Sequence, residues 1–329
     1  MKPKEAVIAV TYRCNARCGM CNIWKSPAPD EMEPRHYKKL PGSLKTINIT
    51  GGEPFLRKDL VNVVRAVHSR APSSRIVFST NGLLTETILK TLSEIQRFHD
   101  AIGVGVSIDG LEEVHDKIRG SSGAFRKAIS TVEGLKGLGL KDLRIGTTLT
   151  QENARDAKSV FALSQKLGVE FSVTFAHNSE IYFQKMDNMP PEFDGELGQP
   201  LKDVLRSQLL SRSVKDWFRA YHIQGIMNPE LRRKFVSQCK AGSRYFFMSP
   251  SGDVYPCMVM NLRIGNLREV CNWDELFKGE AAARAVKAVS NCSEDCWMVC
   301  NTRSHIISHP VRAGSWVAKN KLKAHMHRE

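Results

Sequence analysis

Three cysteines lie close together near the N-terminus, in Cys14-Asn-Ala-Arg-Cys18-Gly-Met-Cys21. Three thiolates in one tight loop can bind three irons of a 4Fe–4S cube, which leaves the fourth iron open to another ligand. A catalytic zinc centre likewise has three protein ligands and one position open to water or substrate. Zinc sites favour Cys-x2-Cys pairs and four ligands, whereas here the spacing is three residues and then two, with no fourth ligand nearby. The spacing therefore favours an iron–sulfur cluster over a structural zinc site or three unrelated cysteines.

The other six cysteines follow after more than two hundred residues without one. In a reducing cytosol, cysteines are more often metal ligands or catalytic groups than disulfides. The clustering therefore predicts two separate sites. The second group consists of Cys239, Cys257, Cys271, Cys292, Cys296 and Cys300.

The bulk composition describes an ordinary globular chain of 329 residues with 42% hydrophobic residues. No segment resembles a signal peptide or a membrane span, so we expect a cytoplasmic protein without membrane contact. The net charge of +14 is spread along the chain without aromatic–basic interleaving, so nucleic acid is not the expected partner. An anionic substrate is compatible with this charge. We expect the basic run over 319–328 to be a frayed tail.

Short apolar stretches alternate with helical patterns through the first half of the chain. Leu60, Val63, Val64 and Val67 follow the i, i+3, i+4, i+7 spacing of an amphipathic helix. Six β/α units in a row predict a parallel sheet, in an open or partial-barrel form. The expected strands are Ala6–Val10, Thr46–Ile49, Arg75–Phe78, Ile102–Ile108, Leu143–Leu149 and Val169–Phe175.

The alternation stops after residue 183. The Pro- and Gly-rich stretch 184–200 is typical of a linker, and 201–238 is amphipathic and predicted to be helical. A hairpin is expected over Phe246–Cys257, with its turn at Ser251-Gly252-Asp253. We therefore divide the chain into a core (1–180), a linker and helical segment (181–236), a cysteine-rich module (237–310) and a basic tail (311–329).

Several motifs in this order resemble the radical S-adenosylmethionine (SAM) superfamily, over at least residues 6–176. The cysteine loop matches the cluster motif, with Tyr12 before it. Gly51-Gly52-Glu53-Pro54 follows the second strand and matches the segment that binds the SAM amino group. The resemblance implies a partial (β/α)6 TIM-like barrel of the α/β class. It also implies SAM and a 4Fe–4S cluster as cofactors.

Later strand ends supply further SAM contacts by the same resemblance. Ser79 and Asn81 end the third strand and Ser107 and Asp109 the fourth, where the family contacts the SAM carboxylate and ribose. Arg119 resembles the arginine that pairs with the SAM carboxylate. The fifth strand, 143–149, lacks the Gly-x-Ile-x-Gly pattern common in the superfamily, which leaves the adenine contacts open.

The chemistry implied by this resemblance begins with one electron passed from the reduced cluster to SAM. The C–S bond then breaks, and the 5′-deoxyadenosyl radical removes a hydrogen atom from the substrate. The cofactor carries the difficult chemistry, and the protein orients it. Because a low potential is needed, the resemblance implies an external donor such as flavodoxin or ferredoxin.

The second cysteine group resembles the SPASM/twitch extension, a small α+β module that binds an auxiliary 4Fe–4S cluster. A full SPASM domain uses seven cysteines for two clusters. Setting aside Cys271, which reads as a structural thiol at a helix entry, five remain, so the one-cluster twitch form fits better. Cys239 and Cys257 are the first choices as ligands. Two of Cys292, Cys296 and Cys300 complete the set, with Cys292 and Cys296 preferred; a zinc knuckle is the alternative.

The leading hypothesis is a radical SAM enzyme acting on a small molecule such as a sugar, cyclitol or nucleotide, with the auxiliary cluster accepting the second electron. It rests on the absence of a leader-binding domain before Cys14. The alternatives are a SPASM-type peptide or protein maturase, and a non-enzymatic iron–sulfur or zinc protein. His177, Glu180 and Tyr182 follow the sixth strand, and His177 is the candidate catalytic base.

Overall fold

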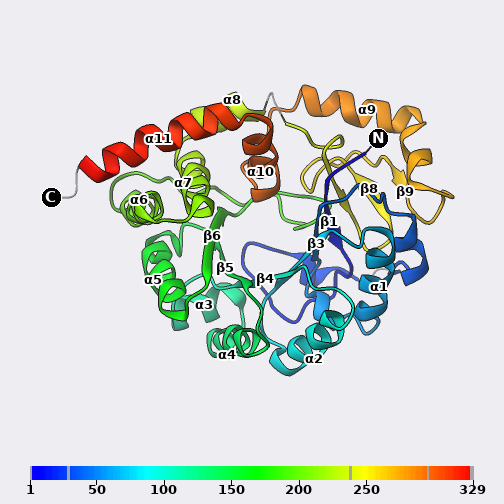
Figure 1. Cartoon of the computed structure of the whole chain (residues 1–329), viewed down its shortest axis with the longest axis horizontal. Coiled ribbons are helices and arrows are strands. Elements are labelled where there is room, and N and C mark those ends of the chain that lie inside the picture. The colour runs from blue at the N-terminus through cyan, green and yellow to red at the C-terminus, as the bar shows by residue number, and fades with distance from the viewer. Residues whose placement is uncertain (1, 28–29, 237–238, 295, 327–329) are drawn as a thin grey trace.

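The computed structural model describes residues 2–27, 30–236, 239–294 and 296–326, and these form one curved mixed sheet with helices around it (Figure 1). The strand order is β6-β5-β4-β3-β2-β1-β7-β8-β9, parallel from β6 to β7 and antiparallel thereafter. The strands are β1 (Glu5–Ala9), β2 (Thr46–Thr50), β3 (Arg75–Thr80), β4 (Ile102–Ser107), β5 (Asp142–Leu149), β6 (Glu170–Phe175), β7 (Tyr245–Met248), β8 (Asp253–Tyr255) and β9 (Gly265–Asn266).

Helices between the parallel strands cover one face of the sheet, as the right-handed β/α connection requires (Figure 1). They are α1 (Leu60–Arg70), α2 (Thr85–Gln96), α3 (Glu112–Arg119), α4 (Ala124–Gly137) and α5 (Ala157–Leu167). Later helices are α6 (Gly195–Leu210), α7 (Val214–Met227), α8 (Pro229–Val236), α9 (Glu280–Ser290), α10 (Val299–Ser308) and α11 (Pro310–Met326). Short 3-10 helices are η1 (Ile23–Lys25), η2 (Pro34–Lys39), η3 (Pro54–Leu56), η4 (Ala154–Asp156) and η5 (Trp273–Phe277). The parallel strands, the helices that cover them and the curved sheet confirm the expected fold class.

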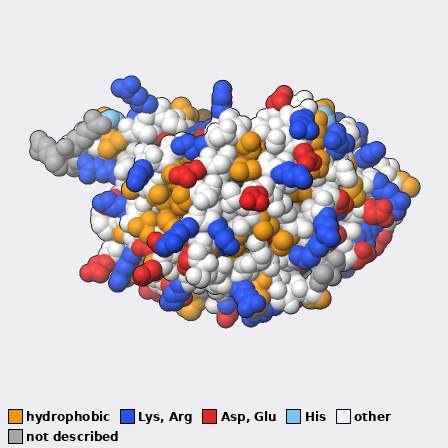
Figure 2. Space-filling model, turned by 90° about the horizontal axis from the view of Figure 1, so that it is seen from below, with side chains coloured by type: hydrophobic (Ala, Val, Ile, Leu, Met, Phe, Trp, Pro, Cys, Tyr) orange, Lys and Arg blue, Asp and Glu red, His pale blue; other side chains and the backbone are white. Residues whose placement is uncertain are grey.

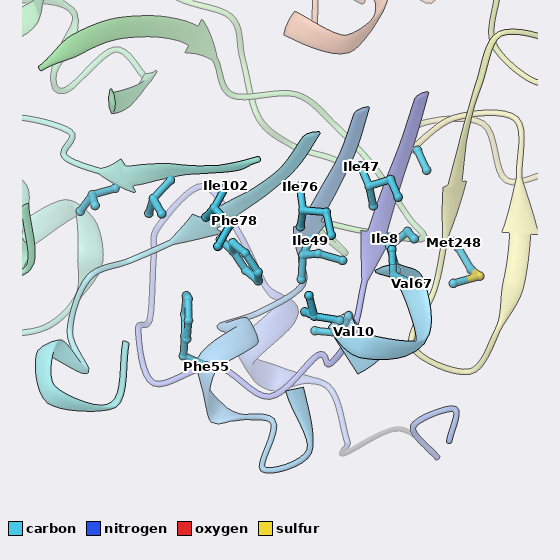
Figure 3. Packing of buried hydrophobic residues seen from close by; sticks show 14 of the residues in the cluster. Ile8, Val10, Ile47, Ile49, Phe55, Val67, Ile76, Phe78, Ile102 and Met248 are labelled. Atoms are coloured by element: carbon cyan, nitrogen blue, oxygen red, sulfur yellow. The ribbon is translucent and has the colours of Figure 1, made fainter. Parts of the chain in front are cut away.

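Alternation along the strands separates the main core from the inner face. Ile8 and Val10 at β1, Ile47 and Ile49 in β2, and Phe78 in β3 pack together beneath the helices (Figure 3). Their sequence neighbours point the opposite way, because successive side chains in a strand alternate between faces. The inner face is therefore left to smaller and more polar side chains, which line the concave side of the sheet.

The cysteine-rich module shares the sheet of the barrel. Strand β7 pairs in parallel with β1, with Glu5 opposite Tyr245 and Ile8 opposite Met248. The predicted hairpin is present as β7 and β8, and Gly252 has a φ of +93° in its turn, a conformation that favours glycine. Because the two strands exchange main-chain hydrogen bonds, the position of the second cysteine group is coupled to the start of the first cysteine loop.

The predicted linker over 184–200 is wrong over residues 195–200. Residues from Gly195 onward form the first turns of α6, and Pro200 lies inside that helix. A proline there removes one main-chain hydrogen bond to the carbonyl of Glu196, four residues earlier. Glu196 is exposed, so water can satisfy that carbonyl near the helix start. The predicted helical segment corresponds to α6, α7 and α8; its last two residues, 237 and 238, lie outside the described residues.

The expected frayed tail is also wrong, because residues up to Met326 form α11. Ala313 and Val317 lie one turn apart and bury against Tyr221 of α7. Lys321 donates hydrogen bonds from Nζ to the carbonyls of Leu209 (2.7 Å) and Ser211 (3.0 Å), at the end of α6. Buried apolar contacts and this lysine cap therefore order a segment that composition alone describes as a tail. Residues 327–329 lie outside the described part.

The visible surface carries positive and negative side chains intermixed (Figure 2). Lysines and arginines are scattered among acidic and apolar side chains on this face, so the excess positive charge is not gathered there into one patch. Within the described ranges, no helix combines the length and apolar character needed to cross a bilayer.

Candidate functional site

A cavity of about 310 Å³ opens on the concave side of the sheet, at the carboxyl ends of the strands. This is the face on which β/α barrels build their active sites. All three cysteines of the N-terminal loop line the cavity at one end, and Met258, Met298 and Cys300 line it from the C-terminal module. The parallel strands and the residues just after them supply the polar wall through Asn48, Thr50, Ser79, Thr80, Asn81, Ser107, Thr148 and Thr174.

The cysteine loop is held at both ends by main-chain hydrogen bonds. At its start, the amides of Gly52 and Glu53 donate to the carbonyls of Thr11 (2.8 Å) and Arg13 (2.9 Å). Further along, the amide of Arg17 donates to the carbonyl of Arg119 at 2.9 Å. The loop is thereby connected to the ends of β2 and α3, although these segments are distant in sequence.

Two glycines are needed where the loop crosses the end of β2. A Cβ at Gly51 would lie 2.1 Å from the carbonyl oxygen of Thr11, and one at Gly52 would lie 2.3 Å from that of Arg13. Both oxygens belong to main chain and cannot rotate away. The Gly-Gly pair is therefore required by the close approach of two backbones, and both glycines also line the cavity.

The loop thiols are partly buried and need a positive partner in order to ionise. Burial raises the pKa of Cys14 to about 12 and that of Cys21 to about 11. The Arg119 guanidinium donates from Nη1 to Cys18 Sγ at 3.6 Å. Three thiols around one end of a cavity, with a buried cation beside them, fit an anionic iron–sulfur cluster, whose irons would replace the thiol protons.

Arg119 joins this loop to the end of β4. Its Nη2 lies 2.6 Å from Oδ2 of Asp109, a carboxylate with no exposed surface. Burial raises the pKa of Asp109, opposed by the guanidinium. Asp109 also accepts from the amide of Thr148 at 2.8 Å. Arg119 faces the cavity and Asp109 lies behind it, so Asp109 can orient the arginine without touching a ligand in the cavity.

Glu53 likewise lies behind the cavity wall, where the resemblance had implied a SAM contact. Its carboxylate is 0% exposed and accepts hydrogen bonds from Thr80 Oγ1, the Asn81 amide (2.8 Å) and the Phe55 amide (3.2 Å). Burial raises the pKa of Glu53 to about 7. In the described structure, the side chain therefore holds the end of β3 against the Gly-Gly turn.

The other expected cofactor contacts divide between the cavity and its surroundings. Ser79, Asn81 and Ser107 line the cavity, and Asn81 donates from Nδ2 to the side chain of Asn15 in the cysteine loop at 2.7 Å. Tyr12 donates its hydroxyl to the carbonyl of Ile181 at 2.8 Å and is not among the described residues that line the cavity.

Three residues after β6 take different positions. His177 lines the cavity, but its Nε2 accepts from the amide of Trp297 at 3.1 Å, and its ring stacks on Phe175. The candidate base is therefore engaged with the C-terminal module. Tyr182 also lines the cavity, and its hydroxyl bonds Thr50 (2.7 Å). Glu180 points away and accepts from Asn261 at 2.9 Å.

A second hollow lies within the C-terminal module. It is lined by four of the cysteines, together with Tyr245 of β7 and Asn301 of α10. Burial raises the pKa of Cys257 to about 11, and the nearby thiols add to the effect. Four thiols around one buried hollow fit a cluster with four protein ligands. These cysteines are Cys239, Cys257, Cys292 and Cys296.

The fifth cysteine of this group, Cys300, lines the central cavity and packs against two buried apolar clusters. Cys14 and Cys21 contact the first of these clusters, and Cys239 and Cys257 contact the second. Cys271 is exposed and lies apart from both hollows in the described structure. Among the described His, Cys, Asp and Glu side chains, no three lie as ligands of a single metal ion would.

Some cavity residues could not be identified from sequence motifs. Met258 and Met298 reach the cavity from the C-terminal module, and Asn48 and Thr148 from strand interiors. Strand alternation could have identified Asn48 and Thr148, because it places both side chains on the concave side of the sheet. The methionines carried no such signal, since their placement depends on the packing of the module against the barrel.

Comparison with known proteins agrees with this geometry. Residues 8–163 match the Radical SAM superfamily, and residues 239–301 match SPASM, an iron–sulfur cluster-binding domain. Mycofactocin maturase MftC of Mycolicibacterium smegmatis is 27% identical over 300 residues, which span 86% of this chain and 74% of that protein. An AdoMet-dependent heme synthase of Methanosarcina barkeri is 27% identical over 288 residues, 81% of this chain and 80% of the relative.

Solved structures show the same fold. SuiB of Streptococcus suis bound to S-adenosylmethionine has a TM-score of 0.61 at 17% identity, covering 88% of this chain and 67% of that one. Native anSMEcpe with bound AdoMet and a peptide has a TM-score of 0.61 at 16% identity, covering 96% and 99%. The first domain implies a 4Fe–4S cluster and SAM, and the second implies auxiliary iron–sulfur binding. The chain is therefore a radical SAM enzyme with a C-terminal SPASM/twitch-type domain.

Proposed function

We propose that Cys14, Cys18 and Cys21 bind the radical-generating cluster and that SAM binds beside them, against Gly51 and Gly52. Bound there, the cluster and SAM supply the 5′-deoxyadenosyl radical that removes a hydrogen atom from the substrate. The observation that carries this proposal is the single cavity lined by all three loop cysteines and by the strand-end polar groups. Reduction by flavodoxin or ferredoxin in the cytoplasm is part of the same proposal.

Within this cavity, the chain's own residues position the reactants and exclude water. The buried Arg119 offers a cation to the SAM carboxylate and to the cluster thiolates. Ser79, Asn81 and Ser107 present polar groups from neighbouring strand ends. Met258 and Met298 close the opposite side with apolar surface. A reactive radical formed there lies in a recess of the protein, which limits its contact with solvent.

The substrate we propose is a side chain of a peptide, so that the enzyme is a maturase. A cavity of about 310 Å³ lies at the small end of ligand sites. SAM occupies part of it, so only a small group of the substrate fits alongside. A single peptide side chain, inserted into the cavity, is small enough for the space that SAM leaves. The similarity to mycofactocin maturase MftC across 86% of this chain supports the same substrate class.

A tetrapyrrole or another small molecule is the second candidate. It is favoured by the similarity to the AdoMet-dependent heme synthase of Methanosarcina barkeri, which covers 80% of that relative. The net charge of +14 suits the carboxylates of such a substrate. A sugar, cyclitol or nucleotide, which the sequence led us to expect, is also a small molecule and stays a prediction.

We further propose that Cys239, Cys257, Cys292 and Cys296 bind the auxiliary cluster, which accepts an electron when the substrate radical is oxidised. Cys300 lines the cavity and also packs against the apolar cluster that Cys239 and Cys257 contact. The second hollow is therefore connected to the cavity through packed side chains, which suits electron transfer between substrate and cluster.

Deuterium transfer tests the proposal. Anaerobically reconstituted protein is reduced with dithionite and incubated with SAM and deuterated candidates: peptides encoded beside the gene, or iron coproporphyrin. Mass spectrometry then measures deuterium in 5′-deoxyadenosine. Label from a peptide supports a maturase, and label from the porphyrin supports the second candidate. The control replaces Cys14, Cys18 and Cys21 with alanine. If wild-type protein forms no more 5′-deoxyadenosine than this control, the proposed function is wrong.

A further inference from the structure

Several thiols of the second hollow take part in hydrogen bonds. The hydroxyl of Tyr245 lies 3.4 Å from Cys239 Sγ, and Nδ2 of Asn301 donates to Cys296 Sγ at 3.2 Å. The main-chain amide of Met260 donates to Cys257 Sγ at 3.3 Å. The first two donors belong to side chains, so they can be removed by substitution without changing the backbone.

Both side-chain donors are held in place by the fold. Tyr245 is 3% exposed and begins β7, where its backbone pairs with Glu5 of β1. Asn301 is also 3% exposed and lies in the first turn of α10. Water is largely excluded from both groups, and hydrogen bonds are electrostatically stronger in such low-dielectric surroundings than in water.

The direction of the tyrosine hydrogen bond follows from the state of the sulfur. In a free thiol, either the S–H or the O–H group can donate. A thiolate bound to iron carries no proton and can only accept. Once Cys239 is a cluster ligand, Tyr245 must therefore be the donor. Asn301 already donates through its amide nitrogen, so both side chains would present protons to negatively charged sulfur.

We infer that Tyr245 and Asn301 are positioning residues that raise the reduction potential of the auxiliary cluster. Reduction adds negative charge to the cluster and its thiolates, and donors to sulfur stabilise the more negative state. The raised potential suits a cluster that accepts an electron from a substrate radical. This inference rests on the ligand set proposed above.

A redox titration of the auxiliary cluster alone tests the inference. In the full-length chain with Cys14, Cys18 and Cys21 changed to alanine, only the second site can hold a cluster, and neither SAM nor substrate is needed. Tyr245→Phe should lower the midpoint potential. At the unsubstituted midpoint, the ratio of reduced to oxidised cluster should fall about tenfold, which is 59 mV for one electron. Electron paramagnetic resonance monitors the reduced cluster.

Two further variants make the result decisive. Asn301→Leu should shift the midpoint in the same direction. Tyr221→Phe is the matched control, because it removes the hydroxyl of a buried tyrosine that packs in the apolar contact between α7 and α11. The midpoint potential of the auxiliary cluster in this variant should not change. Unchanged midpoints in Tyr245→Phe and Asn301→Leu, with iron content retained, would overturn the inference and leave the proposed function standing.

Iron content separates the remaining outcomes. If the parent triple-alanine protein binds no iron, the proposed ligand set is wrong. If Tyr245→Phe alone loses its iron, the midpoint of Asn301→Leu decides the question. Loss of iron from both variants would show that these residues serve cluster assembly, which also overturns the inference.

Discussion

Replacing Glu53 with glutamine should change how the stability of the protein depends on pH. Glu53 is fully buried, and burial raises its pKa from 4.5 to about 7. Between these two values, the folded state holds a proton that the unfolded state has lost. Stability must therefore fall as pH rises through this window, because the folded state binds more protons. Glutamine cannot titrate, so Glu53→Gln lacks this dependence.

The size of the effect follows from the shift in pKa. A change from 4.5 to about 7 corresponds to about 3 kcal/mol, of which about 2.5 kcal/mol is lost between pH 5 and pH 8. For 329 residues, the unfolding entropy is roughly 0.7 kcal/mol/K. The melting temperature of the native protein, relative to that of Glu53→Gln, should therefore be about 3–4 °C higher at pH 5 than at pH 8.

Differential scanning fluorimetry of anaerobic, cluster-loaded protein measures this difference. Other titrating groups, such as the buried His115 and His222, affect both proteins equally and cancel in the comparison. Glu133→Gln, on the exposed face of α4, is the control and should follow the native protein at every pH. Melting temperatures of native protein and Glu53→Gln that run parallel from pH 5 to pH 8 would refute the reasoning.

Three other predictions test the site. Gly52→Ala places a Cβ against a main-chain oxygen of the cysteine loop and should slow 5′-deoxyadenosine formation roughly a hundredfold by mass spectrometry; a native rate would contradict this. Arg119→Met strands the buried Asp109 carboxylate, at a cost of about 3–5 kcal/mol, so the melting temperature should fall by roughly 4–7 °C. Adding Asp109→Leu to Arg119→Met should restore the melting temperature. A double variant that melts as low as Arg119→Met would contradict this explanation. Cys300→Ser should keep about eight irons per chain and Cys296→Ser about four by colorimetric assay; equal losses would place Cys300 among the ligands.

The strands and the family could be predicted because their signals are local. Each strand of the barrel is a short apolar run whose alternate residues face the helices, as Ile47 and Ile49 do. The cysteine spacing and the Gly51-Gly52 pair are likewise readable as motifs. The structure supplies a physical cause for the pair, since two backbones cross where no side chain fits.

Other features could not be predicted because they depend on partners distant in sequence. Pro200 favours a linker locally, yet it lies in a helix whose exposed start tolerates the lost hydrogen bond. The lysine-rich end favours a tail, yet Ala313 and Val317 bury one of its faces. In both cases, packing against other elements outweighs the local preference.

The amino-acid sequence by itself determined the chemistry available to this protein: two groups of thiols, a glycine pair and polar strand ends, in an order that a parallel sheet brings to one face. Only the tertiary structure decided which groups meet. Cys296 and Cys300 are four residues apart, yet one lines the second hollow and the other the central cavity. That division follows from the pairing of β7 with β1 and from the start of α10 between the two cysteines, long-range packing that spacing along the chain does not encode.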